Sequence, residues 1–506
     1  MSVEPPADRP NPEQQLESGA DAARTLLRNS TYFLASDSII KLLSFIFTVY
    51  VVRQLGDERF GLYSTALAYA GIFSIIGDLG MTQLAVREIA RGRRKPDELF
   101  WNLVLIRLLL STVATVVITS SAWYVAGYSA EMVLGIFLVC FSFFLHAFLG
   151  PVNIILQGKE RLDQTAILSA VIQVFFVTAG TLVLLNGFSF YGLIIASYVG
   201  VPVAAVLGAR YIRRLKLANL HFNIDFSLWL PLLRKSLPFA IITFTLVAAT
   251  DLDTVLLSLW RSPEEVGWYK AAYNLIFRLM FIKTALLSTL GPQLSRYYGV
   301  SIERVASSFH SGFKLLWSFS FPIAVGGTLL AQPIITLLYT DAYANSVPVF
   351  AILIWALPLL YLSSLFGQLT TATDRETKAV RVYMTSAILN LVSNIIAIPI
   401  WGYVGAAAST ILTEVVSLAL FYWVVHDEFP LTDLKNTLFK PLVAGLVMGG
   451  VILLISDWPL LPVVAVGAGV YGGVLLLLRP FNASETALLQ GGWMSLRRKL
   501  GWSSSQ

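Results

Sequence analysis

The chain has 506 residues, of which 56% are hydrophobic and only 13% are charged, and its mean hydropathy is +0.71. A soluble globular protein carries about 25% charged residues, and no soluble fold of this length buries enough surface to hide so apolar a composition. These values exclude a water-soluble protein and predict an integral membrane protein. The net charge is +6, and the charged residues lie in short clusters between apolar runs, as in loops that face anionic lipid. Nucleic acid is therefore not expected as a partner.

A polar, proline-rich stretch opens the chain and predicts a disordered cytoplasmic tail over residues 1–28. A membrane-crossing helix needs about 20 mostly apolar residues, and windows of that length predict two bundles and a helix pair. The N-terminal bundle, over 29–214, has spans near 29–52, 59–80, 100–127, 130–156, 163–186 and 190–212. After a cytoplasmic linker over 215–235, the second bundle, over 236–427, has spans near 236–260, 265–290, 305–330, 345–371, 378–400 and 403–426. A helix pair over 428–480, near 438–456 and 460–478, precedes an amphipathic cytoplasmic tail over 481–506.

The predicted fold class is therefore all-α, with about fourteen transmembrane helices in two pseudo-symmetric six-helix bundles and a C-terminal pair. An even number of spans places both termini on one side, and the basic clusters around 87–95 and 210–216 fall on that same side. Positive residues accumulate in cytoplasmic loops, so we expect a multi-pass protein of the cytoplasmic membrane with both termini in the cytoplasm. The basic, amphipathic stretch 84–95 is expected to lie as an interfacial helix against anionic membrane lipids.

One short phrase occurs twice, just inside the second span of each set of six. The stretch RFGLYSTALAYAGIF begins at Arg59 and EVGWYKAAYNLIF begins at Glu265, so that Gly61 corresponds to Gly267. Because six spans bring the chain back to the same side, both copies enter the membrane in the same direction. A parallel repeat of this kind predicts two halves related by an axis along the membrane normal, with a seam near the bilayer midplane where such transporters bind their cargo.

Three cations lie deep in the predicted spans, where a charge is costly unless it has a partner or faces a wet cavity. They are Lys41 in the first span and Arg278 and Lys283 in the eighth. We predict that they line a substrate-binding cavity, since a phosphate or pyrophosphate linker, or an acidic sugar, needs positive charge once it leaves water. The structural alternative is a set of fixed ion pairs between the bundles. Arg107 and Lys314 are nearer the cytoplasmic ends of their spans, so their side chains are expected to reach the interface.

Three acids also fall within the predicted spans: Asp37 in the first, and Asp251 and Asp253 in the seventh. Asp37 lies one turn from Lys41, and residues at this spacing can pair along one helix face, which favours a structural role for that pair. The acids are expected to balance the cations of the empty site or to bind a coupling ion, either a proton or sodium. No cofactor is expected beyond such an ion.

Several absences from the sequence count against an enzyme. It contains no G-x-x-x-x-G-K-[ST] loop to hold a nucleotide phosphate, and no clustered histidine and cysteine ligands for a metal. No sizeable soluble segment separates the spans to host glycosyl transfer. No catalytic residue and no metal site are therefore predicted.

Three stretches of the sequence resemble one family of membrane transporters. GLYSTALAYAGIFSIIGDLGMTQLAVREIARGRRK (61–95) looks like the second span and following loop of the polysaccharide flippases. DLDTVLLSLWRSPEEVGWYKAAY (251–273) resembles their seventh and eighth spans, and ILNLVSNIIAIPIWGYVGAAASTILTEVV (388–416) is similar to their eleventh and twelfth. The family is the polysaccharide transporter, or Wzx-like oligosaccharide flippase, branch of the multidrug/oligosaccharidyl-lipid/polysaccharide (MOP) exporter superfamily. The likeness covers nearly the whole chain.

The resemblance implies a MATE-like fold and a flippase that moves a lipid-linked oligosaccharide or polysaccharide precursor across the cytoplasmic membrane by alternating access. Its partners would be the lipid-linked glycan, membrane lipids and glycan-assembly proteins, and it would act as a monomer. Three alternatives stay open at this point. They are a multidrug antiporter on the same fold, a lipid II flippase, and a non-transporting scaffold of a glycan assembly complex.

Overall fold

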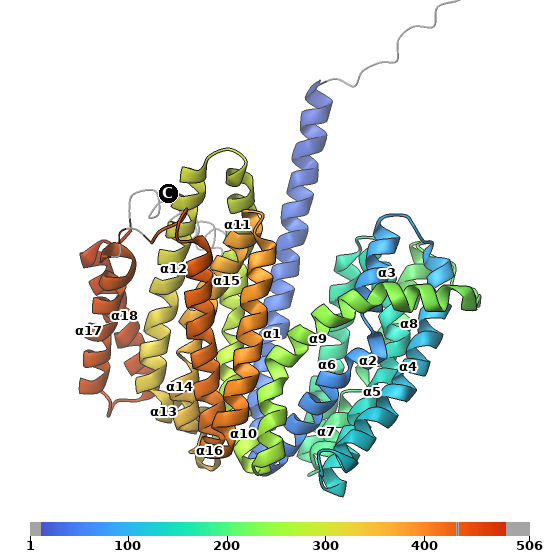
Figure 1. Cartoon of the computed structure of the whole chain (residues 1–506), viewed down its shortest axis with the longest axis horizontal. Coiled ribbons are helices and arrows are strands. Elements are labelled where there is room, and N and C mark those ends of the chain that lie inside the picture. Colours follow the sequence, from blue (N-terminus) through green and yellow to red (C-terminus); the bar gives the residue numbers. More distant parts are fainter. Residues whose placement is uncertain (1–11, 432, 434, 482–506) are drawn as a thin grey trace, which may run out of the picture. The chain divides into compact units, whose positions relative to one another are not determined.

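The computed structural model describes residues 12–431, 433 and 435–481, with side chains from Ile40 onward except at positions 246, 249, 285 and 289 (Figure 1). All regular elements in this part of the chain are helices, which confirms the all-α class that the sequence predicts. Ten of the described helical segments are long and apolar enough to cross a membrane, or up to twelve if two strongly bent pairs each count as one span. The number of about fourteen spans stays a prediction.

The helices follow one another along the chain with short connections. The first half contains α1 (Pro12–Phe73), α2 (Ile75–Asp78), α3 (Met81–Ala90), α4 (Pro96–Tyr124), α5 (Ala130–Gly158), α6 (Leu162–Leu185), α7 (Phe190–Ala196) and α8 (Gly200–Arg214). The second half contains α9 (Trp229–Trp260), α10 (Pro263–Arg278), α11 (Met280–Tyr298), α12 (Ile302–Leu329), α13 (Ala331–Tyr339), α14 (Ser346–Leu353), α15 (Ala356–Ala372), α16 (Glu376–Val425), α17 (Lys440–Leu454) and α18 (Leu460–Leu478). Two long runs are interrupted by glycines with positive φ, Gly56 in α1 (73°) and Gly402 in α16 (58°), so each contains two helices joined at a kink.

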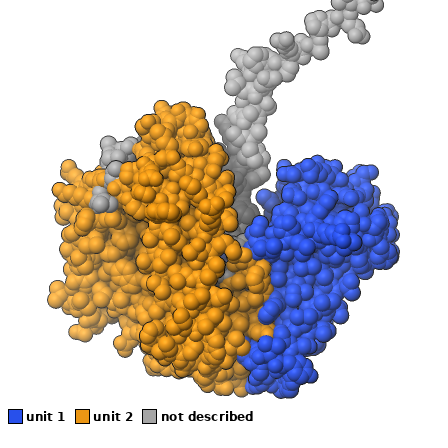
Figure 2. Space-filling model, in the orientation of Figure 1, with its two compact units in different colours: residues 1–51, 73–243 blue, residues 52–72, 244–506 orange. Residues whose placement is uncertain are grey.

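The chain divides into two compact units, each built from separate stretches of sequence (Figure 2). The first unit comprises residues 1–51 and 73–243, and the second comprises 52–72 and 244–506. The beginning of the predicted second span thus groups with the later helices. Helix α1 begins at Pro12, inside the segment for which a disordered tail is predicted, and the predicted tail over 481–506 lies outside the described residues except at position 481. The domain boundaries stay predictions.

In the first unit a sharp turn follows the end of the predicted second span. Helix α2 ends at Asp78, and Leu79 and Gly80 then adopt positive φ angles of 45° and 73° before α3 begins. A Cβ on Gly80 would lie 2.4 Å from the backbone nitrogen of Ala240 and 2.7 Å from the carbonyl oxygen of Ser236. Glycine is therefore required here twice, for the left-handed conformation and for the close approach of α9. The break falls at the last two residues of the span expected near 59–80 and marks where that span ends.

The basic stretch 84–95 is helical only as far as Ala90, as part of α3. Its apolar side chains Leu84, Ala85 and Ile89 are buried in a core shared with α4, α5 and α8. This apolar face packs on protein because the neighbouring helices cover it. The expectation that the stretch lies against lipid is therefore wrong for that face.

In the second unit the two copies of the repeated phrase pack directly against each other. A Cβ on Gly61 would lie 1.7 Å from the carbonyl oxygen of Pro263, and a Cβ on Gly267 would lie 2.1 Å from the carbonyl oxygen of Asp57. Each glycine faces the residue one helical turn before its counterpart, so the contact is reciprocal. The indole Nε1 of Trp268 donates a hydrogen bond to the Asp57 carboxylate (2.8 Å) at the same crossing. Membrane helices approach most closely through such small residues.

The last two helices, α17 and α18, pack side by side and against α12 (Figure 1). Lys314 of α12 donates from Nζ to the carbonyl oxygen of Pro480 (3.1 Å), and Lys440 of α17 donates to that of Arg479 (3.2 Å). Cations are favourable at the C-terminal end of a helix, where carbonyl groups lack intrahelical partners. Lys314 is only 6% exposed, so the expectation that it reaches the interface is wrong, and it instead ties α18 to α12.

Candidate functional site

Asp253 of α9 is the most deeply buried predicted site residue whose side chain is described, with 6% exposure. Its Oδ2 accepts hydrogen bonds from the Tyr269 hydroxyl of α10 (2.9 Å) and from Oγ1 of Thr410 in α16 (3.2 Å). Its Oδ1 accepts one from Nδ2 of Asn394, also in α16 (2.8 Å). A buried carboxylate persists only when it is hydrogen-bonded in this way. Asn394 Oδ1 is buried without a hydrogen-bond partner among the described residues, so an unfilled acceptor remains beside the carboxylate.

Asp251 lies two residues earlier in α9 and forms an ion pair with Lys270 of α10, with 2.9 Å between Oδ1 and Nζ. Lys270 is 8% exposed, and its Nζ also lies 4.8 Å from the centre of the Tyr273 ring. Removing one partner of a buried pair leaves an uncompensated charge, so this pair holds α9 and α10 together. This pair lies within the second unit and so is not one of the ion pairs between the bundles that the structural alternative expects, and the role of Asp251 stays a prediction. Sequence reasoning missed Lys270 as its partner.

Arg278 is the last residue of α10, and a single residue, Leu279, separates it from the start of α11 at Met280. A cation at this position interacts favourably with the carbonyl groups that a helix leaves unpaired at its end. One of the carbonyl oxygens at this junction, that of Leu279, accepts a hydrogen bond from the Tyr361 hydroxyl of α15 (2.6 Å). Arg278 is partly buried, so the structure places a cation at the junction of α10 and α11.

Lys283 lies in α11 and lines a trough of 590 Å³ between α11 and α15. Its Nζ donates a hydrogen bond to Oγ of Ser364 across the trough (2.9 Å). Cavities of a few hundred Å³ are large enough for small ligands. Most lining side chains are small or carry hydroxyl or amide groups: Lys283, Thr284, Leu287, Ser288, Gly291 and Ser295 of α11, Ser364, Gly367, Gln368, Thr371 and Ala372 of α15, and Tyr383 of α16.

The remaining predicted site residues are not brought to this trough. Lys41 lies in α1 within the first unit, and its side chain is exposed. The side chain of Asp37 lies outside the described residues, so its pairing with Lys41 stays a prediction. Asp251, Asp253 and Lys283 belong to the second unit, where the acids lie in α9 and the lysine in α11.

A buried ion pair in the first unit was missed by sequence reasoning. Arg107 of α4 is 7% exposed, pairs with the Asp78 carboxylate at the end of α2, and donates to Oγ1 of Thr82 (2.6 Å). A Cβ on Gly150 of α5 would lie 1.6 Å from Nη1 of Arg107, so this glycine leaves the space that the guanidinium occupies. The expectation that Arg107 reaches the interface is wrong. The sequence GDLG at 77–80, which marks the helix break, is the signal that could have indicated it.

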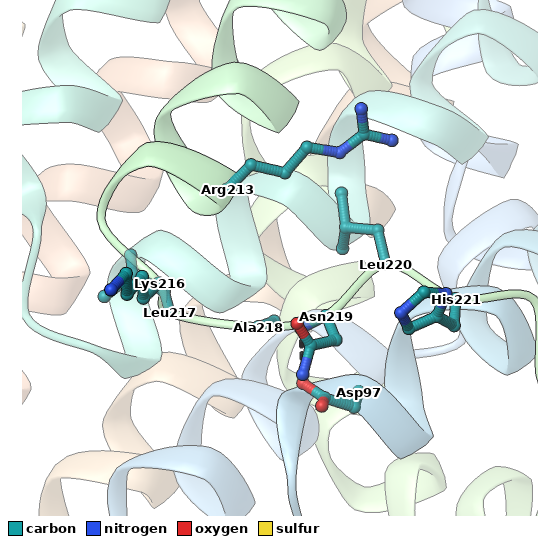
Figure 3. A pocket seen from close by; sticks show the side chains of 8 residues that line it. All are labelled: Asp97, Arg213, Lys216, Leu217, Ala218, Asn219, Leu220 and His221. Carbon is teal, nitrogen blue, oxygen red and sulfur yellow. Dashed lines mark hydrogen bonds between the residues drawn. The ribbon is translucent and has the colours of Figure 1, made fainter.

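A second hollow, of 640 Å³, lies in the first unit beside the predicted cytoplasmic linker (Figure 3). Arg213, Lys216 and His221 line it, and all three side chains are exposed. Its one acidic group, Asp97, accepts a hydrogen bond from the backbone N–H of Asn219 (2.9 Å), drawn as a dashed line in Figure 3. This carboxylate therefore positions the loop. The described residues contain no cluster of three or more histidine, cysteine, aspartate or glutamate side chains suited to a metal.

Two sequence families match the chain. Residues 26–298 match the family described as "Polysaccharide biosynthesis protein", and residues 268–463 match the family described as "Lipid II flippase MurJ". The first match covers more than half of the chain and includes α9 and α10 with Asp251, Asp253 and Arg278. Lys283 lies in the stretch that both families match.

Individual proteins agree with these families. A Haloferax volcanii protein named "Probable low-salt glycan biosynthesis flippase Agl15" is 23% identical over 423 residues, which cover 81% of this chain and 85% of its own. A solved structure titled "Lipid II flippase MurJ, inward closed conformation" superposes with a TM-score of 0.69 at 15% identity, over 88% of this chain and 98% of its own. An inward-facing multidrug resistance MATE family transporter gives a TM-score of 0.62 at 15% identity, over 78% of this chain and 98% of its own. These likenesses confirm the expected MATE-like membrane fold.

Proposed function

The chain belongs to the polysaccharide biosynthesis protein family, and on that premise we propose that it is a flippase for a lipid-linked oligosaccharide or polysaccharide precursor. The name of the Haloferax relative supports the glycan, and the fold shared with a lipid II flippase supports movement of a lipid-linked head group. We place the protein in the cytoplasmic membrane with both termini in the cytoplasm, acting as a monomer and without catalysis.

The observation that carries the proposal is the polar trough beside Lys283, inside a bundle of apolar helices. Moving an unpaired hydroxyl or amide out of water costs roughly 2–7 kcal/mol, so a glycan with many hydroxyls cannot cross hydrocarbon unaided. Serine, threonine and glutamine side chains within the membrane replace the lost water. Lys283 adds positive charge, and we propose Arg278 and Lys41 as further cations along the substrate path.

The mechanism that fits this arrangement is alternating access. The polar head would enter a hydrated path from one side and leave it on the other, while the lipid tail stays in the bilayer. Breaks in the helices, as at Leu330 between α12 and α13, which are bent by 77°, allow segments to change direction without the loss of a whole span. No covalent step is needed, because the substrate is chemically the same before and after transport.

The test is reconstitution of the purified full-length protein into liposomes with a fluorescent lipid-linked oligosaccharide. We expect the label to become accessible to an external quencher at least about tenfold faster than in protein-free liposomes, a barrier reduction of about 1.4 kcal/mol or more. A fluorescent phospholipid without a glycan serves as the matched control and should not be accelerated. Equal acceleration of both lipids, or acceleration of neither, would contradict the proposal. Acceleration of neither lipid would favour the alternative of a non-transporting scaffold in a glycan assembly complex.

We further propose that Asp253 binds the coupling ion, either a proton or sodium. Its carboxylate is buried, and Lys270 of α10 forms its ion pair with Asp251 rather than with Asp253. The unfilled Oδ1 of Asn394 and the hydroxyl of Thr410 lie on the same helix as each other and add neutral oxygens next to the charge. A buried carboxylate with neutral oxygen neighbours suits a small cation.

Substitution tests this role. Under an imposed proton or sodium gradient equivalent to about 100 mV, which is worth about 2.3 kcal/mol per charge, wild-type transport should accelerate severalfold for one of the two ions. Asp253→Asn should lose this acceleration, because the amide carries no charge to exchange, while movement without a gradient continues. Asp341→Asn removes an exposed carboxylate and serves as the matched control. An unchanged response of Asp253→Asn to both gradients would refute the assignment.

A further inference from the structure

The chemistry of the trough between α11 and α15 is specific enough to name a class of ligand. We propose that it binds a single sugar ring bearing one carboxylate, as in a uronic acid residue of the glycan, rather than the diphosphate that joins a glycan to its lipid. This inference rests on the proposed function, because it identifies which part of the substrate occupies the trough.

The first argument is the charge of the trough. Lys283 is the only basic side chain among the described residues that line it. Glu414 of α16 interacts electrostatically with Lys283 and offsets part of its charge. A diphosphate brings two or more negative charges into a space that offers at most one positive charge, and uncompensated charge away from bulk water is costly. A carboxylate brings a single negative charge, which Lys283 can balance.

The second argument is the distribution of donors and acceptors. The hydroxyl protons of Thr284, Ser364 and Thr371 are donated to backbone carbonyls within their own helices, those of Met280, Leu360 and Gly367. Their oxygen lone pairs are therefore what these side chains offer to a ligand. Such a lining requires a ligand rich in hydrogen-bond donors, which a sugar ring with several hydroxyl groups supplies and a diphosphate does not.

Two side chains that line the trough, Gln368 and Lys283, have hydrogen-bonding capacity left for a ligand. Oε1 of Gln368 is buried and, within the described part of the chain, has no hydrogen-bond partner. An unfilled buried acceptor costs free energy until a donor reaches it. The Lys283 ammonium carries three protons, and one of them is donated to Ser364. The trough thus lacks one hydroxyl donor for Gln368 and one anionic acceptor for Lys283, and both occur together on a sugar acid.

Two glycines leave room for polar side chains that line the trough. A Cβ on Gly291 would lie 2.8 Å from Oε1 of Gln368, and a Cβ on Gly367 would lie 2.4 Å from the Tyr383 hydroxyl. A larger residue at Gly291 would displace the Gln368 acceptor that we assign to the ligand, and one at Gly367 would displace the Tyr383 side chain from the wall of the trough. The Tyr383 ring packs edge-on against Phe421, with ring centres 5.2 Å apart, and this contact fixes its position beside the trough. Leu287 and Ala372 add apolar surface suited to the C–H face of a sugar.

The experiment measures binding of soluble probes to the purified full-length protein in nanodiscs, by calorimetry at constant ionic strength. Glucuronate, glucose and inorganic pyrophosphate are the three probes. We expect glucuronate to bind at least about tenfold more tightly than glucose, and pyrophosphate to bind more weakly than glucuronate. Lys283→Gln should abolish the preference for glucuronate over glucose, because only the contact with the carboxylate is lost. Gln368→Leu should weaken both sugars by a similar factor and keep the preference.

The matched control is Lys378→Gln, which removes an exposed lysine at the start of α16 and should leave all three affinities unchanged. Tighter binding of pyrophosphate than of glucuronate would overturn the inference, and so would equal binding of glucose and glucuronate or no saturable binding of either sugar. Because no transport is measured, the result is independent of the liposome test. Transport without a preference for glucuronate would refute this inference alone, and the preference without transport would refute the flippase alone.

Discussion

Proteoliposomes that contain the Arg278→Gln/Lys283→Gln variant are expected to move lipid-linked glycan no faster than protein-free vesicles. Both cations belong to one span, since Arg278 ends α10 and Lys283 lies one turn into α11. Losing a hydrogen bond from a charged group costs about 1.5–3 kcal/mol. Two such losses together slow transport by about a hundredfold or more. Glutamine keeps much of the side-chain length and polarity, so the purified variant should remain folded.

The single variants and a control make this result interpretable. Lys283→Gln alone is expected to remove most of the activity, because Lys283 is the cation of the trough. Arg278→Gln should have the smaller effect, because Arg278 lies at the junction of α10 and α11 and does not line the trough. Lys378→Gln should transport like the wild type. Transport by the double variant at the wild-type rate would show that these cations do not bind the substrate.

Gly61→Val and Gly267→Val are each expected to lower the free energy of unfolding by about 1–3 kcal/mol, the usual cost of overpacking. The added side chains would meet the carbonyl oxygens of Pro263 and Asp57. These are backbone atoms, so they cannot rotate away, and the two helices must separate. Thermal unfolding of the detergent-solubilised protein measures the loss.

The double variant provides a sharper test than either single change. Once one valine has separated the helices, the second meets less resistance, so the combined loss should be smaller than the sum of the two. Gly450→Ala is the matched control, because a Cβ at Gly450 of α17 meets no atom within 4 Å, and alanine is favoured over glycine in a helix by about 1 kcal/mol. Fully additive losses, or no loss from either single change, would show that the crossing is not tightly packed.

The sequence predicts the fold class and the buried charges because both depend on local composition. Apolar runs locate the helices, and a charge inside such a run is visible at once, as for Asp253 and Lys283. What the sequence does not reveal is which distant residues meet that charge. Asn394 and Thr410, which bind the Asp253 carboxylate, are far along the chain and are common polar residues in any membrane helix.

The trough is a second case in which the sequence does not reveal which distant residues lie together. The polar residues of α11 recur at helical spacing, from Thr284 through Ser288 to Ser295, a pattern from which one polar face could have been predicted but was not. It does not predict that Gln368 of α15 faces them, because packing between helices decides this. Arg107 is a plainer error. A basic residue near a helix end was expected to reach the interface, but the break after Asp78 brings a carboxylate to it inside the protein.

The reciprocal contact between Gly61 and Gly267 gives a physical reason for the similar sequences around these two glycines. Where identical surfaces meet across a two-fold axis, each residue constrains the position that constrains it. A larger side chain in one stretch therefore collides with the backbone of the other stretch, so a change at either glycine destabilises the contact for both.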